Sequence, residues 1–185
     1  MSMFGDGLDA AVQKAFTRPA PKSAPAQMRY LVKQLKGTRP VAQMLRISQR
    51  TVERYVKDQI KKPRPDLAAR LEREVKKRWQ PQIRAKARQK AATTGGIVID
   101  ARARIGYTAP IGTTDEDRLR HLTVALPPQY AARLFDAQEQ GASDQQLQQI
   151  AADALKEVYF QDNGRRAGQL EEVRFTDIEH LEFDL

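Results

Sequence analysis

The residues best able to do chemistry in this sequence form one short run, IGTTDEDR, from Ile111 to Arg118. It places two neighbouring hydroxyls, those of Thr113 and Thr114, directly before three consecutive acids. An exposed hydroxyl can act as a nucleophile, and adjacent carboxylates can help to order a metal ion. The same residue types also occur at helix starts, where Thr114 would cap a helical turn and the acids would complement its dipole. Spacing alone leaves both interpretations open.

Other kinds of reactive site are poorly represented. The chain has no cysteine, so thiol nucleophiles, disulfides and thiolate metal sites are excluded. Its two histidines, His121 and His180, are too few to favour a metal site built from histidines alone. No glycine-rich phosphate loop and no metal-ligand spacing occurs in the sequence. A nicking activity with Tyr107 as nucleophile is disfavoured because this tyrosine falls on the apolar face of a predicted strand. We therefore expect a protein that is not an enzyme and binds no cofactor or metal of its own.

The charge divides the chain into two parts. The 185 residues carry a net charge of +9, but residues 1–92 hold 23 Lys+Arg against 7 Asp+Glu, a charge of +16, whereas residues 93–185 hold 9 against 16, a charge of −7. This distribution predicts a basic half that binds nucleic acid and an acidic half with another role. The first residues, MSMFGDGLDA, lack the features of a signal peptide, and no apolar run approaches membrane-spanning length. We expect a cytoplasmic protein without a membrane partner.

An apolar pattern in the basic half predicts a helix-turn-helix. In GTRPVAQMLRISQRTVERYVKD, apolar residues recur at helical spacing on both sides of a turn at Ile47, and Ser48 is a suitable N-cap for the second helix. Arg46 stands where such a turn usually has glycine, which leaves an ordinary helical hairpin as the alternative. The expected core positions are Val41, Ala42, Met44, Leu45, Val52, Tyr55 and Val56.

The second helix of such a motif enters the major groove of DNA, where arginine suits guanine and glutamine suits adenine. The expected base-reading residues are Gln49, Arg50, Thr51 and Arg54. Phosphate contacts are expected from Arg39, Lys57, Lys61 and Lys62 and, along the following basic stripe, from Lys76, Lys77 and Arg78. The stripe continues through Arg84, Lys86, Arg88 and Lys90, in a long basic helix that Pro81 should kink or restart.

The second half predicts elements in the order strand, strand, helix, helix, strand. The strand patterns are IVIDARARIGYT at 97–108, RHLTVALP at 120–127 and, near the end, EEVRFTD followed by HLEFDL. The helical patterns are PPQYAARLFDAQEQ and SDQQLQQIAADALKEVYF, the latter with capping-box spacing between Ser143 and Gln146. The stretch from Arg120 to Phe160 resembles part of the ribbon-helix-helix fold, whose strands pair across a two-fold axis. We therefore expect a homodimer.

Together these patterns predict an α+β fold, predominantly α, with three parts. Residues 1–26 form an N-terminal segment ending in the Pro/Ala/Ser linker RPAPKSAPA, residues 27–92 a basic helix-turn-helix domain, and residues 97–185 an acidic α+β association domain. The glycines of TTGG, Thr93 to Gly96, mark the boundary between the last two.

A more specific resemblance runs along the whole chain. The stretch from FGDGLDAAVQKAF to IGTTDEDR, together with EVYFQDNGRRAG and EEVRFTDIEHL, is similar to the telomere-protecting terminal proteins of linear streptomycete chromosomes and plasmids. The resemblance implies a protein joined covalently to the 5′ ends of linear DNA, which primes the synthesis that fills the terminal single-stranded gap and caps the end. In the family a threonine accepts the nucleotide, and the matching residue here is Thr114. This assigns priming to the acidic domain and places the protein at chromosome ends in the bacterial nucleoid.

The resemblance also implies partners. These are telomeric DNA with a 3′ overhang, a telomere-associated DNA-binding protein, and a DNA polymerase that supplies Mg²⁺ at its own site. The acids beside Thr114 would imitate the charge of a primer strand or help to order that metal ion. From the residues alone, the alternative is a helix-turn-helix transcription regulator with a dimerising C-terminal domain, which leaves the hydroxyl run and the polybasic stripe without a role.

Overall fold

The computed structural model describes residues 2–108, 115–161 and 172–185. The fold is α+β and predominantly helical, as predicted, and the three strands in these ranges form one antiparallel sheet. The chain divides into two compact units, which we call the helical unit, residues 17–81, and the sheet unit, residues 1–16 and 82–185. The helical unit holds 18 Lys+Arg against 5 Asp+Glu, a charge of +13, and the sheet unit holds 14 against 18, a charge of −4. The charge asymmetry therefore follows the structural division.

The helical unit contains four helices around one apolar core. They are α2 (Ala24–Gln34), α3 (Thr38–Leu45), α4 (Gln49–Val56) and α5 (Pro65–Arg78). Ser23 caps α2 by accepting a hydrogen bond from the N–H of Ala26, and Pro25 lies in the first turn, where its missing N–H costs nothing. The last three residues of the expected linker, Ala24 to Ala26, are therefore the start of a helix. The largest fully buried side chains of this core are Met28, Leu31, Leu45 and Leu71.

The sheet unit is built on a long central strand. The strands β1 (Ile97–Thr108), β2 (Asp115–Leu126) and β3 (Glu172–Asp184) lie in the order β2-β1-β3. The apolar residues of β1 are buried from Ile97 to Ile105 at every second position, which confirms the predicted alternation. In β2, Leu122 and Val124 lie opposite Ala101 and Ile99 and continue the same inner face. The third strand is one continuous element, with an irregular register where Asp177 adopts a φ of 46°.

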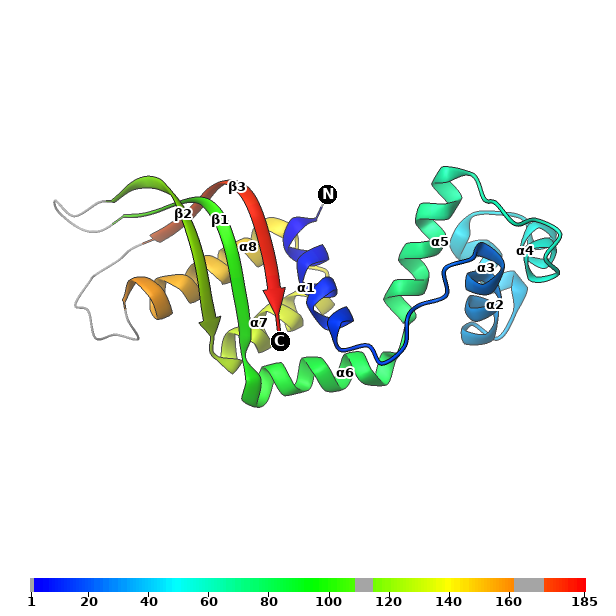
Figure 1. Cartoon of the computed structure of the whole chain (residues 1–185), viewed down its shortest axis with the longest axis horizontal. Coiled ribbons are helices and arrows are strands. Elements are labelled where there is room, and N and C mark those ends of the chain that lie inside the picture. Colours follow the sequence, from blue (N-terminus) through cyan, green and yellow to red (C-terminus); the bar gives the residue numbers. More distant parts are fainter. Residues whose placement is uncertain (1, 109–114, 162–171) are drawn as a thin grey trace. The chain divides into compact units, whose positions relative to one another are not determined.

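Three helices pack with the inner face of the sheet to form one core. They are α1 (Met3–Lys14), α7 (Pro128–Glu139) and α8 (Asp144–Leu155), and Figure 1 shows them on the same side of the strands. The two π-helical turns η1 (Ala91–Gly95) and η2 (Lys156–Phe160) follow α6 and α8. After η1, Gly96 adopts a φ of 70°, and a Cβ at this position would collide with the carbonyl oxygen of Leu126. Gly96, the second glycine of TTGG, is thus required where the chain leaves η1 and enters β1 beside the end of β2.

The N-terminal helix α1 belongs to this core, although the sequence predicted an N-terminal segment and linker. The ring of Phe4 lies 6.4 Å from that of Phe175 and 6.1 Å from that of Phe183, centroid to centroid. At the start of α1, the Asp144 carboxylate accepts hydrogen bonds from the N–H groups of Met3, Phe4 and Gly5 at 2.9–3.1 Å, and one from the Ser2 hydroxyl at 2.9 Å. Asp144 therefore satisfies the first turn of α1 from a helix more than a hundred residues away in sequence.

The basic stripe also divides differently from the prediction. The predicted long basic helix is two helices, α5 and α6 (Pro81–Lys90), separated at Trp79 and Gln80. Of the two predicted effects of Pro81, a kink or a restart, the restart is confirmed. Almost all of α6 lies in the sheet unit, because Arg84 is buried with its Nη2 2.7 Å from the Asp9 carboxylate of α1. The expected boundary near residue 92 therefore moves to residues 81–82. Within the described ranges, no helix combines the length and the apolar character needed to cross a membrane.

Candidate nucleic-acid interface

Helices α3 and α4 form the predicted helix-turn-helix pair. They meet through a short turn in which Arg46 adopts the left-handed conformation, with φ 53° and ψ 49°. The N–H of Ile47 donates to the carbonyl of Ala42 at 3.0 Å and closes the turn. Arg46 thus takes the conformation that glycine adopts most easily, at a cost of about 1–2 kcal/mol for a residue with a side chain. The departure from glycine does not prevent the motif from forming.

Helix α4 begins and packs as its sequence predicts. The Ser48 hydroxyl accepts a hydrogen bond from the N–H of Thr51 at 3.1 Å. The Ser48 and Thr51 hydroxyl oxygens are also 2.8 Å apart, and Thr51 is half-buried. Val52 and Tyr55 are buried against α2 and α3 as part of the core. Thr51 therefore contributes to the helix start, rather than projecting with the exposed side chains of α4.

The face of α4 opposite the core is cationic. Arg50, Arg54 and Lys57 are exposed and, within the described ranges, make no ion pair. The predicted phosphate-binding residues Arg39, Lys61 and Lys62 are exposed as well. Exposed cations on the side of a helix that faces away from the core are the arrangement that phosphate and base-edge contacts require.

Gln49 lies at the edge of this face and is tied to its neighbours. Its Nε2 donates to the Thr38 hydroxyl at 3.0 Å and to the Glu53 carboxylate at 3.0 Å. Because a side-chain amide has two protons on nitrogen, both donors of Gln49 are used within the protein. The bidentate contact with adenine that the sequence suggested needs one of those protons, so it would require a rearrangement.

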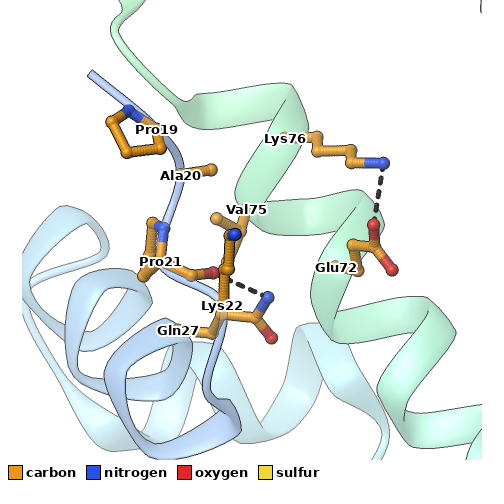
Figure 2. A pocket seen from close by; sticks show the side chains of 8 residues that line it. All are labelled: Pro19, Ala20, Pro21, Lys22, Gln27, Glu72, Val75 and Lys76. Carbon is orange, nitrogen blue, oxygen red and sulfur yellow. Dashed lines mark hydrogen bonds and ion pairs between the residues drawn. The ribbon is translucent and has the colours of Figure 1, made fainter.

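The stripe at the end of α5 is partly neutralised. Figure 2 shows the ammonium group of Lys76 directed at the Glu72 carboxylate, and the two groups are 2.7 Å apart. Arg78 is held by the carboxylate and the carbonyl of Glu74 one turn earlier. Lys77 is exposed and makes no ion pair in the described part of the chain. Of the three predicted phosphate-binding residues on α5, Lys77 is thus the one that could contact phosphate without first breaking an ion pair.

Beside this stripe, a groove of about 400 Å³ runs between α5 and the segment that precedes α2. It is lined by Pro19, Ala20, Pro21, Lys22, Gln27, Glu72, Val75 and Lys76. Gln27 closes one wall by donating from its Nε2 to the carbonyl of Pro21 at 2.9 Å (Figure 2). This bond holds the segment that enters α2 against the first turns of α2 itself.

The arginines expected further along the stripe have a structural role instead. Arg84 and Arg88 both contact the Asp9 carboxylate, at 2.7 and 3.7 Å, and Arg88 is also paired with Glu139. These ion pairs join α6 to α1 and α7. Lys86 and Lys90 remain exposed on α6. The polybasic stripe predicted from sequence is therefore not one continuous cationic surface.

The predicted nucleotide-accepting residue Thr114 lies outside the described residues, as does the rest of the segment 109–114. The acids after it begin β2, so the interpretation in which Thr114 caps a helical turn is wrong. On β2, the Asp117 carboxylate lies 3.5 Å from Arg174 Nη2 and accepts a hydrogen bond from the Thr176 hydroxyl at 3.2 Å. Among the described residues, no group of three acidic or histidine side chains is placed to hold a metal ion.

Comparison of the chain with protein-family models, with curated proteins and with solved structures finds no match.

Proposed function

We propose that this chain is a terminal protein of linear replicons, which binds telomeric DNA through α4 and offers the Thr114 hydroxyl as the primer for DNA synthesis. The observation that supports DNA binding is the exposed cationic face of α4 on a unit of charge +13. The priming role is supported by the resemblance of the sequence to terminal proteins. Each part has its own test.

The dimensions of α4 fit the proposed contact with duplex DNA. Eight helical residues extend about 12 Å, and a helix with its side chains is about 10–12 Å wide, close to the width of the major groove. Arg50 and Arg54 are one helical turn apart on the same face, so their Cα atoms are separated by about 6 Å along the axis. That spacing lets them reach guanines about two base-pair steps apart, with Lys57 and the lysines after it on the flanking phosphates.

The DNA-binding part is tested by replacing Arg50 and Arg54, one at a time, by alanine. Each change should weaken binding by about 1–3 kcal/mol and relax the base preference at one position, as measured by fluorescence anisotropy on matched duplexes. Arg73→Ala on α5 is the control, because Arg73 is also exposed but lies on another helix of the same unit. An equal loss of affinity for every duplex sequence would show that the two arginines contact phosphates and not bases. Unchanged affinity would show that α4 is not the interface.

In the proposed priming reaction, the Thr114 oxygen attacks the α-phosphate of a deoxynucleotide. A phosphodiester bond to the threonine forms, pyrophosphate leaves, and the hydroxyl proton passes to a base of the polymerase site or to water, under metal ions that the polymerase supplies. Thr114 directly precedes β2, whose first residue Asp115 pairs with Tyr107 near the end of β1. The nucleophile is thus carried by the sheet unit, while the helical unit holds the telomeric DNA with its 3′ overhang.

The proposal extends to the partners of the chain. They are the telomere-associated DNA-binding protein that recruits it, the DNA polymerase that extends it, and a second copy of the chain in a homodimer at chromosome ends in the nucleoid. The edge of β2 that faces away from β1 has no strand beside it in the described part of the chain, which is compatible with pairing between copies. In solution the protein should then sediment as a dimer at micromolar concentration.

The priming part is tested by replacing Thr114 with alanine. The variant should fold and bind DNA normally but accept no labelled nucleotide from the polymerase, because the change removes the nucleophilic oxygen and adds no bulk. Thr114→Ser should retain some transfer, and Thr113→Ala, the matched control, should retain all of it. Full transfer to Thr114→Ala would overturn the proposed nucleophile. A transcription regulator with the same helix-turn-helix would give the same DNA-binding results but would accept no nucleotide at all.

A further inference from the structure

One acid interrupts the cationic face of α4. Glu53 lies on the same outward side as Arg50, Arg54 and Lys57, between the two arginines in sequence, and it is half-buried. Glu53 and Lys57 are one turn apart in the order that favours an i,i+4 ion pair, yet no such pair forms within the described residues. A carboxylate at this place is repelled by DNA phosphates, so it weakens binding to an arbitrary duplex.

The carboxylate is held in place by neighbouring side chains. Gln49 donates one amide proton to Glu53 Oε1 at 3.0 Å and the other to the Thr38 hydroxyl on α3, also at 3.0 Å. The amide of Gln49 therefore links Glu53 to the first helix of the motif and fixes its rotamer. One oxygen of the carboxylate accepts from Gln49, and no other described residue donates to the second. Such a fixed acceptor on a groove-facing helix suits one base edge in particular, the N4 amino group of cytosine.

We propose that Glu53 reads a cytosine, accepting a hydrogen bond from its N4 amino group while Arg50 or Arg54 binds guanine. The sequence recognised by α4 then contains neighbouring G·C pairs. On other sequences the carboxylate of Glu53 has no base donor and remains near the phosphates, which lowers the affinity. Gln49 and Thr38 are positioning residues for this contact. This inference rests on the proposed binding of duplex DNA by α4.

The test starts from selection of duplexes out of a randomised pool with the full-length protein. Binding of single-base variants of the selected duplex is then measured for the wild type and for Glu53→Ala, Glu53→Gln and Glu72→Gln. Glu72→Gln is the control because it removes the same charge from the same unit at an exposed site on α5. A second comparison uses Thr38→Val, which removes the hydroxyl that holds Gln49.

The wild type should prefer cytosine at one position by about five- to a hundredfold over the other bases. Glu53→Ala should lose this preference because it binds duplexes without that cytosine more tightly, whereas Glu72→Gln should keep the preference. Glu53→Gln should shift the preference toward adenine, which glutamine recognises through its amide. Thr38→Val should reduce the preference without changing binding to unrelated duplexes.

The same cytosine preference in Glu53→Ala would overturn the inference and leave DNA binding by α4 intact. If Glu53→Ala and Glu72→Gln raised affinity equally and neither changed the base preference, Glu53 would contribute charge alone, and the inference would also be overturned. Failure of the wild type to bind any duplex at low salt would instead overturn the proposed function itself.

Discussion

Replacing Lys57, Lys61 and Lys62 together by alanine should strongly flatten the salt dependence of DNA binding. Lys57 lies on the cationic face of α4, and Lys61 and Lys62 follow it in the chain. All three are exposed, and none makes an ion pair within the described residues. Each phosphate contact contributes about 0.9 to the slope of log K against log salt concentration for duplex DNA. Loss of three contacts should therefore reduce the slope by about 2.7.

The matched replacement on α5 should have a smaller effect. Of Lys76, Lys77 and Arg78, the first is paired with Glu72 and the third with Glu74. Only Lys77 is without an ion-pair partner in the described chain, so the triple alanine variant should reduce the slope by about 0.9. Both variants remove three positive charges, and their difference therefore reports which cations contact phosphate.

The assay is fluorescence anisotropy of a labelled duplex over a series of salt concentrations, with circular dichroism to show that both variants remain folded. Equal slope changes in the two variants would contradict this expectation, because the ion pairs on α5 would then have no influence on phosphate binding. A larger change for the α5 variant would place the phosphate-binding surface on α5 instead of α4.

Three further predictions concern the sheet unit. Asp144→Ala should lower the free energy of unfolding by about 1–3 kcal/mol, because the first turn of α1 loses its acceptor, and chemical denaturation should show it; an unchanged midpoint would contradict the capping role. The hydrogen bond from the Thr123 hydroxyl lowers the pKa of Asp100, so the ionised carboxylate stabilises the fold above about pH 4 and this contribution is lost in acid; Thr123→Val should raise that pKa in an NMR titration, and no change would contradict the cause. Leu122→Asp combined with Val124→Asp should unfold the sheet unit, since both side chains lie on its inner face, whereas a folded monomer by sedimentation would place them at a dimer interface instead.

The sequence predicted those parts of the fold that depend on neighbouring residues. Ser48 and Ser143 cap α4 and α8 as expected, because capping involves residues two or three positions apart. The strand alternation and the helix-turn-helix core were predictable for the same reason, since burial follows the period of each element. The predicted order of strands and helices from residue 97 onward is confirmed on these grounds.

The contacts that the sequence did not predict join residues far apart in the chain. No local pattern shows that Asp144 caps α1 or that Arg84 is buried against Asp9, because each pair forms only when separate helices pack. The domain boundaries and the extent of the basic stripe were misplaced for this reason. Arg84 and Arg88 belong to a basic run of the sequence that suggests phosphate binding, but the carboxylates of Asp9 and Glu139 neutralise them.

The candidate site was predictable in outline and not in its details. Basic charge and helical period were sufficient to locate Arg50 and Arg54 on the exposed face of α4. The role of Gln49 was not predictable, because its side-chain amide forms a hydrogen bond with the hydroxyl of Thr38 on another helix. Glu53 carried a signal that could have been used, since it is the acid in the most basic helix of the motif.

The most direct test of the central proposal is to map the nucleotide that a DNA polymerase attaches to this protein. The purified chain is incubated with polymerase, Mg²⁺, overhang DNA and one labelled deoxynucleotide, denatured, digested with trypsin and analysed by mass spectrometry. Cleavage after Arg104 and Arg118 releases IGYTAPIGTTDEDR, which holds four hydroxyl residues, so fragmentation of this peptide must assign the modified one. The proposal predicts one nucleotide on Thr114. A nucleotide on Tyr107, Thr108 or Thr113, or on any other peptide, would contradict it. A protein that binds the DNA but accepts no nucleotide would contradict it as well.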